Sequence, residues 1–226
     1  MEEPQPRLPA LLLVLTVTTG MIDAVSVLGL GRVFTANMTG NIVFLGFAIA
    51  RIPEFSASRS LAALGAFLAG AVVGGRLGLR LDSSRRQWLL VVASIESCIL
   101  FVAAGAAIGY DREHLAPFPR LSALIALTAV AMGIRNSTVR RLAVPDLTTT
   151  VLTLTLTGLG ADSSLAGGSN PRWVRRIASV AAMLVGAVIG AMLVTTVGLV
   201  WPLALIGSVT LLATVVYVVA PEPRRA

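Results

Sequence analysis

Eight long apolar stretches constrain this chain more than any other feature of its sequence. They fall at about 8–30, 33–50, 58–80, 88–110, 118–139, 145–161, 174–197 and 199–219. A helix needs about 20 apolar residues to cross the hydrocarbon core of a bilayer. Hydrophobic residues make up 56% of the chain and charged residues only 13%, so little polar sequence is left for a water-soluble domain. The sequence predicts an all-α integral membrane protein with about six to eight membrane segments in a single polytopic domain over residues 1–226.

The charged residues are typical of topology signals and not of nucleic-acid binding. All 18 basic residues are arginines, and they give a net charge of +7. They are spread over several loops, as the positive-inside rule places them, and no loop interleaves them with aromatic residues. The apolar run from Leu8 lacks a basic segment before it and a clear small-residue cleavage site after it. We therefore expect a retained first helix and not a signal peptide.

Polar residues recur at matching places in two halves of the chain, about 8–110 and about 118–219. Asp23 in Gly-Met-Ile-Asp corresponds to Asn136 in Gly-Ile-Arg-Asn, and Thr39-Gly40-Asn41 corresponds to Thr153-Leu154-Thr155. Gly70 and Gly74 correspond in the same way to Gly186 and Gly190. The offsets are nearly constant, at 113, 114 and 116 residues. The pattern predicts an internal repeat of four segments.

The second and sixth segments differ from the others because they are short and rich in Thr, Asn and Gly. Short, interrupted segments at corresponding positions of two halves are typical of re-entrant or broken helices around a site at the membrane midplane. In the sixth segment, Thr153, Thr155 and Thr157 alternate with leucines, which favours locally extended backbone. The alternative is an ordinary helix whose Thr hydroxyls bond back to its own carbonyls.

The distribution of arginines favours the re-entrant arrangement. If all eight segments span the membrane, the arginines divide 10 to 8 between the two sides. If the second and sixth segments enter and leave on one side, six helices span, both termini lie inside, and the arginines divide 13 to 5. The second arrangement obeys the positive-inside rule better. It also gives three spans to each half, so the halves would be inverted copies.

Several polar residues within apolar segments are candidates for a substrate or ion pathway, because such residues are costly in lipid and need a partner, water or a function. Asp23 is either a functional carboxylate or a structural partner of Arg135 or Asn136. Glu96 is either a proton carrier or a hydrogen-bonded packing residue. Hydroxyl and amide groups near these acids could line a cavity or simply pack helices. The complete candidate set is Asp23, Thr35, Asn37, Thr39, Asn41, Glu96, Arg135, Asn136, Thr153 and Thr155.

The run Arg32-Val-Phe-Thr-Ala-Asn-Met-Thr-Gly-Asn41, with Gly20-Met-Ile-Asp-Ala24 before it and Met132-Gly-Ile-Arg-Asn136 later, resembles the YoaK family of uncharacterised bacterial inner-membrane proteins. The resemblance covers nearly the whole chain. It implies a multi-pass protein of the bacterial cytoplasmic membrane and carries no biochemical activity with it. The family usually has Gln where this chain has Arg135, and Thr-Gly where it has Thr153-Leu154, so we expect a modified site in the second half.

Together these features favour a small secondary transporter or permease for a small polar solute or ion, in which Asp23 or Glu96 carries a coupling proton. The alternative is a membrane scaffold or assembly partner whose polar groups only lock helices together. An enzyme is not expected, since the chain has one His and one Cys and no motif for a metal, a phosphate or an activated nucleophile; no cofactor is predicted. The expected partners are the lipid bilayer and a small polar solute or proton, and self-association into a homo-oligomer is left open.

Overall fold

A computed structural model describes residues 7–81, 84–144 and 152–220 of the chain. Within these ranges the protein is entirely helical apart from its loops, as predicted. Its elements are α1 (Leu8–Gly29), α2 (Met38–Ile49), α3 (Ala57–Arg80), α4 (Arg85–Ala106), α5 (Phe118–Leu142), α6 (Leu152–Ala161), the short 3-10 helix η1 (Ser164–Ala166), α7 (Trp173–Val197) and α8 (Val200–Val219).

Six of these helices, α1, α3, α4, α5, α7 and α8, are long and apolar enough to cross a membrane. The other two, α2 and α6, have 12 and 10 residues, which gives them lengths of about 18 and 15 Å at 1.5 Å per residue. A hydrocarbon core is about 30 Å thick. The described residues of neither short helix are therefore long enough to span it. The first seven residues of the predicted sixth segment lie outside the described residues.

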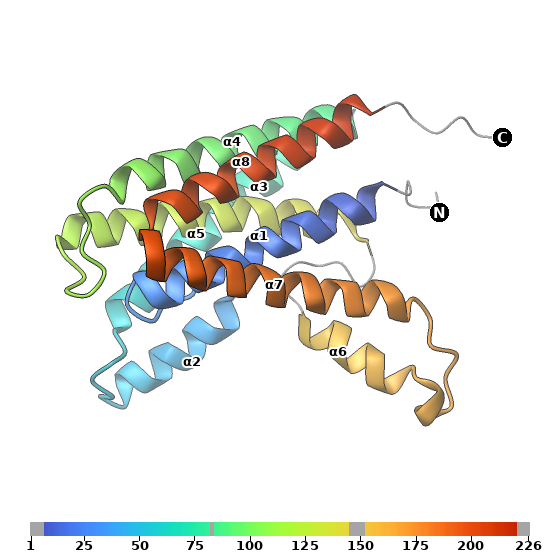
Figure 1. Cartoon of the computed structure of the whole chain (residues 1–226), viewed down its shortest axis with the longest axis horizontal. Coiled ribbons are helices and arrows are strands. Elements are labelled where there is room, and N and C mark those ends of the chain that lie inside the picture. The colour runs from blue at the N-terminus through green and yellow to red at the C-terminus, as the bar shows by residue number, and fades with distance from the viewer. Residues whose placement is uncertain (1–6, 82–83, 145–151, 221–226) are drawn as a thin grey trace.

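The six long helices form one bundle with its most buried members in the middle. Among them α1 and α5 are the most buried, whereas α3 and α7 are the least. α1 packs along α7 and α8, α5 packs along α3 and α4, and α4 packs along α8. Figure 1 shows that α1 begins and α8 ends at the same end of the bundle, while α2 and α6 flank the bundle toward opposite ends.

Glycines bring the outer helices into close contact with the inner ones. A Cβ atom on Gly20 of α1 would lie 2.3 Å from the carbonyl oxygen of Met183 in α7. In the other crossing, a Cβ atom on Gly133 of α5 would lie 2.1 Å from the carbonyl oxygen of Phe67 in α3. Small residues at such crossings let two backbones touch, which is a main source of helix association in membranes.

The segment between α1 and α2 turns back along the bundle, and Asn41 holds it from the start of α2. Asn41 is fully buried. Its Oδ1 accepts a hydrogen bond from the backbone N–H of Phe34 at 2.9 Å, and its Nδ2 donates to the carbonyl oxygen of Phe34 at 2.6 Å. Non-helical backbone at membrane depth needs such internal partners. Asn41 thus satisfies both backbone groups of Phe34 in the non-helical segment before α2.

The prediction of extended backbone around Thr153 was wrong, because residues Leu152–Ala161 form helix α6. The hydroxyl of Thr157 donates to the carbonyl oxygen of Thr153 at 2.8 Å, which is the back-bonding expected of Thr within a helix. Arg176 of α7 fixes the far end of α6. Its guanidinium donates to the carbonyl oxygen of Gly158 at 2.5 Å and pairs with Asp162 at 2.7 Å.

Candidate functional site

The most unusual side chain in the bundle is Arg135 of α5, which is 1% exposed and is among the largest fully buried side chains. Arginine stays charged in proteins and carries five N–H donors. A charge of this kind inside a membrane segment is costly unless it has partners within the protein. The residues around Arg135 therefore form the natural candidate site.

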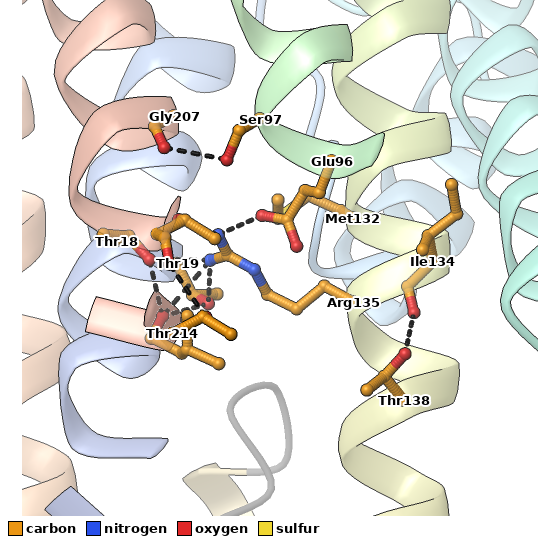
Figure 2. Close-up of polar contacts among 12 residues, drawn as sticks. Thr18, Thr19, Glu96, Ser97, Met132, Ile134, Arg135, Thr138, Gly207 and Thr214 are labelled. Atoms are coloured by element: carbon orange, nitrogen blue, oxygen red, sulfur yellow. Dashed lines mark hydrogen bonds and ion pairs between the residues drawn. The ribbon is translucent and has the colours of Figure 1, made fainter. Parts of the chain in front are cut away.

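Three helices supply the partners of Arg135, which itself lies on α5. Its Nη2 forms an ion pair with Oε1 of Glu96 on α4 and donates to the hydroxyl of Thr210 on α8 at 2.8 Å. Its Nη1 donates to the hydroxyls of Thr18 and Thr19 on α1 at 2.8 and 3.2 Å. Figure 2 shows the guanidinium between Glu96 on one side and the two threonines on the other. We call Thr18, Thr19, Glu96, Arg135 and Thr210 the Arg135–Glu96 network.

The threonines of α1 can accept hydrogen bonds from Arg135 because their own protons are already used. The hydroxyls of Thr18 and Thr19 donate to the carbonyl oxygen of Leu15 at 3.0 and 2.8 Å. Nη1 of Arg135 also donates to that carbonyl at 3.2 Å. The helix backbone thereby orients both hydroxyl oxygens toward the guanidinium.

One donor of Arg135 remains unused. Its Nε is buried and has no hydrogen-bond partner among the described residues. Beside the guanidinium lies a small cavity with room of about 20 Å³ for the centres of water molecules, which is enough for about one water. The cavity is lined by Leu11, Leu15, Leu89, Val92, Ala93, Glu96, Arg135, Thr138, Val139, Leu142, Thr210 and Thr214.

A second set of buried polar atoms lies about one helical turn further along α1. Asp23 follows Thr19 by four residues, about 6 Å along the helix axis, and is 8% exposed. The backbone N–H of Ala36, in the segment before α2, donates to its carboxylate. Oδ1 of Asp23 and the hydroxyl of the fully buried Thr35 have no partner among the described residues. The segment before α2 thus closes over an acid that forms no ion pair with any residue in the described part of the chain.

The expectation that Asp23 might pair with Arg135 does not hold in this structure. Arg135 reaches α1 at Thr18 and Thr19, one turn before Asp23, and its ion pair is with Glu96. Asn136, the other partner considered for Asp23, is half-buried and donates from Nδ2 to the carbonyl oxygen of Met132 in its own helix at 2.8 Å. Glu96 and Asp23 therefore occupy different environments, one with a cation and one without.

The remaining predicted site residues divide by exposure. Asn41 and Thr155, which correspond in the predicted repeat, are both buried. Thr39 and Thr153, which also correspond, are exposed on the outer surface of α2 and α6, and Asn37 is half-buried. The structure therefore brings together Glu96 with Arg135, and Asp23 with the segment that contains Thr35. It leaves Thr39 and Thr153 outside both groups.

Comparison with known proteins places the chain in a family. A family model described as a protein of unknown function, DUF1275, matches residues 11–217. The chain belongs to this family. It is also 36% identical over 155 residues to the UPF0700 transmembrane protein YoaK of Bacillus subtilis (strain 168), an alignment that covers 68% of this chain and 66% of that protein. No solved structure matches the chain.

In this DUF1275 chain, three members of the Arg135–Glu96 network were missed by sequence reasoning. Thr18, Thr19 and Thr210 lie in strongly apolar helices, where Thr is tolerated because it bonds to its own backbone. The available signals were the Thr16-Val-Thr-Thr19 run in the first segment and the Ser208-Val-Thr210 patch in the eighth. Within the described part of the chain there is no cluster of three or more His, Cys, Asp or Glu residues that could hold a metal ion.

Proposed function

We propose that this chain is a small secondary transporter or permease for a small polar solute or ion, and that it has no enzymatic activity. One observation carries the proposal, namely the Arg135–Glu96 network. Its ion pair joins α4 and α5 through side chains that are no more than 3% exposed. Hydrogen bonds from Arg135 extend the network to α1 and α8. Ionisable residues within membrane segments commonly mark substrate or ion pathways. Hydrophobic side chains would hold the same four helices together without burying two charges.

The proposed internal repeat supports this function. Gly20 and Gly133 correspond in it, and they sit at the α1–α7 and α5–α3 crossings. α2 packs on α3 and α6 packs on α7, which is the same relation in each half. In inverted-repeat transporters the substrate site lies where the two repeats meet. The Arg135–Glu96 network takes α1 and α4 from the first half and α5 and α8 from the second.

The same reasoning supports a place in the bacterial cytoplasmic membrane with both termini in the cytoplasm. α1 begins and α8 ends at one end of the bundle. With Arg135 inside the bundle, the six-span arrangement puts 12 of the 18 arginines on that side and five on the other, counted from the sequence, as the positive-inside rule requires.

A scaffold function is the second candidate, and the small cavity favours it. Room for about one water molecule beside Arg135 would be consistent with a polar lock between helices. In that case the network would stay dry, and a stable protein partner would be recovered with the chain in mild detergent.

Water access to the cavity separates the two functions. Single cysteines at Thr138 and Thr214, which line the cavity, would be placed in a Cys98→Ser background and treated with a membrane-impermeant thiol reagent on cells and on inverted vesicles. Leu184, 63% exposed on α7, supplies a lipid-facing control. A transporter predicts labelling of both cavity positions but not of residue 184. Protection of both positions in well-folded variants would reject transport in favour of the scaffold.

A further inference from the structure

The guanidinium of Arg135 presents an edge that is only half occupied. Nη2 contacts one oxygen of Glu96, whereas Nε has no partner. A carboxylate or similar oxyanion can accept two parallel hydrogen bonds from such an edge, and this arrangement is stronger and more specific than a single contact. Glu96 uses one carboxylate oxygen for this contact, so a free anion could bind the same edge more completely.

A small cavity adjoins both members of the ion pair and could receive such an anion. It adjoins Glu96 and Arg135, and Thr138, Thr210 and Thr214 are the other polar residues that line it. These hydroxyls could donate to an anion if they gave up their present bonds to helix carbonyls, as Thr138 and Thr214 now make at 2.9 Å each. The present volume holds about one water, so a carboxylate would fit only if Glu96 moved away from Arg135.

Charge balance decides what Glu96 must do when it moves. Arg135 is the only charged side chain that Glu96 contacts among the described residues, and the cavity is lined by no other titratable group. On α1, the residues that contact Arg135 are the neutral Thr18 and Thr19, and Asp23 lies one turn further along that helix. On α8, the residue that contacts Arg135 is the neutral Thr210. A second anion beside Arg135 would leave a net negative charge in an apolar interior, which is strongly unfavourable. Uptake of a proton by Glu96 removes that charge.

We propose that Arg135 binds a small monovalent oxyanion such as a carboxylate, and that Glu96 releases Arg135 by taking up one proton as the anion binds. The inference rests on the proposed transport function and names its substrate class. The anion replaces the carboxylate of Glu96 at the guanidinium, a proton from the aqueous side converts Glu96 to the neutral acid, and the site stays neutral overall. Anion and proton would then cross together, and transport would be electroneutral.

Isothermal titration calorimetry on the purified full-length protein in detergent tests the binding step. Sodium formate is the probe. The background salt is sodium gluconate, whose anion is too large for the cavity. Titrations in two buffers of different ionisation enthalpy count the protons taken up. We expect uptake of about one proton per formate and binding that weakens by up to tenfold per unit rise in pH, as proton linkage requires. Formate binding with no proton uptake, or no formate binding at millimolar concentrations, would overturn the proposal.

Variants assign the effect to the two residues. We expect Arg135→Gln to abolish formate binding, and Glu96→Gln to retain binding but lose both the proton uptake and its pH dependence. Arg112→Gln, at an arginine outside the spanning helices, should match the original protein. Equal binding by the Arg135→Gln protein would place the anion elsewhere and reject the site. If neither network variant folds, the number of protons taken up by the unmodified protein on formate binding still tests the proposal.

Flux measurements separate this inference from the transport function. In proteoliposomes with an internal pH dye, we expect a formate gradient to drive acidification that is unaffected by a potassium–valinomycin potential. Formate binding with proton uptake but without flux would reject transport and keep the anion site. Flux that depends on membrane potential, or flux of a neutral solute that formate does not inhibit, would keep transport and reject the anion site.

Discussion

At the residue scale, Arg135 is stable inside the bundle because three neighbouring helices, α1, α4 and α8, contribute oxygens to its guanidinium. α4 supplies a carboxylate, α1 supplies two hydroxyls whose protons are donated to the carbonyl oxygen of Leu15, and α8 supplies a third hydroxyl. Removing one member of such a pair leaves an uncompensated charge, whereas replacing both members with apolar groups can be nearly neutral. This asymmetry distinguishes a buried ion pair from an ordinary hydrogen bond.

Truncation of either partner should therefore be severe. We expect Glu96→Leu and Arg135→Leu each to lower the free energy of unfolding by about 3–5 kcal/mol, measured by denaturant unfolding in detergent. The double variant should be less destabilised than the sum of the two. Arg140→Leu, at an exposed position near the end of α5, is the matched control. Additive losses in the double variant would contradict a direct pair.

Outside the spanning helices, His114 and Asp111 form an exposed pair in the loop between α4 and α5, with Nδ1 and Oδ2 2.7 Å apart. The hydrogen bond to Asp111 raises the pKa of His114 above its ordinary value of 6.5. Hydrogen bonds from the His114 side chain and from backbone N–H groups lower the pKa of Asp111 below 3.8. The His114 contribution to stability is thus complete below pH 6.5 and is lost as the pH rises through the folded-state pKa. The Asp111 contribution is present above pH 3.8 and is lost as the pH falls.

Because His114 is the only histidine in the chain, its imidazole can be followed alone by NMR. We expect its midpoint to lie above 6.5 in the original protein and to fall toward 6.5 in Asp111→Asn, since the substitution removes the negative charge that favours the imidazolium. Asp162→Asn, in the distant loop after α6, should leave it unchanged. An identical midpoint with and without Asp111 would show that the pair does not form in solution.

At the element scale, glycine positions set which helix faces meet. A Cβ on Gly70 of α3 would lie 2.2 Å from the carbonyl oxygen of Val130 in α5, closer than real Cβ atoms come, whereas a Cβ on Gly75 of the same helix would meet nothing within 4 Å. The two residues are five positions apart, so they lie on different faces of α3. One faces the contact with α5, and the other does not.

This pair of glycines gives a matched test. We expect Gly70→Ala to destabilise the bundle by about 1–3 kcal/mol, because overpacking forces the α3 and α5 backbones apart. Gly75→Ala should be neutral or stabilising by up to about 1 kcal/mol through helix propensity. Both would be compared by unfolding in detergent under the same conditions. Equal effects would argue against the close crossing of α3 and α5.

At the scale of the whole molecule, the short helices decide the topology. In the proposed six-span arrangement, with α2 and α6 re-entrant, the loop before α3 and the loop after α4 would fall on one side of the membrane, and the loop after α6 on the other. α2 carries exposed apolar side chains such as Ile42 and Phe47, which suits contact with lipid. The two termini then share a side.

Single cysteines in a Cys98→Ser background test this topology. We expect Pro53→Cys and Glu113→Cys to react with an impermeant thiol reagent added from outside the cell, and Leu165→Cys, at a position 99% exposed, to react only after the membrane is opened. The physical reason is that six spans and two re-entrant helices put the first two loops opposite the third. Labelling of both Pro53→Cys and Glu113→Cys only after the membrane is opened, on the side of the N-terminus, would require α2 to span.

The sequence alone determined the class of this protein, since eight apolar stretches and few charges leave only a helical membrane fold. It also singled out Glu96, Arg135 and Asp23, because charges in apolar segments are conspicuous wherever they pack. The sequence could not predict which of those residues form an ion pair with each other. Glu96 and Arg135 are 39 residues apart in the chain, and their meeting depends on how α4 and α5 cross and rotate against α1 and α8.

Tertiary structure likewise decided the roles of the threonines. Thr18, Thr19 and Thr210 bind Arg135, whereas Thr39 and Thr153, which stand out more in the sequence, are exposed on the outside of their helices. A threonine can satisfy its hydroxyl within its own helix on any face, so its presence in an apolar segment does not show where it points. Only the packing of the bundle fixes which hydroxyls reach the buried charge.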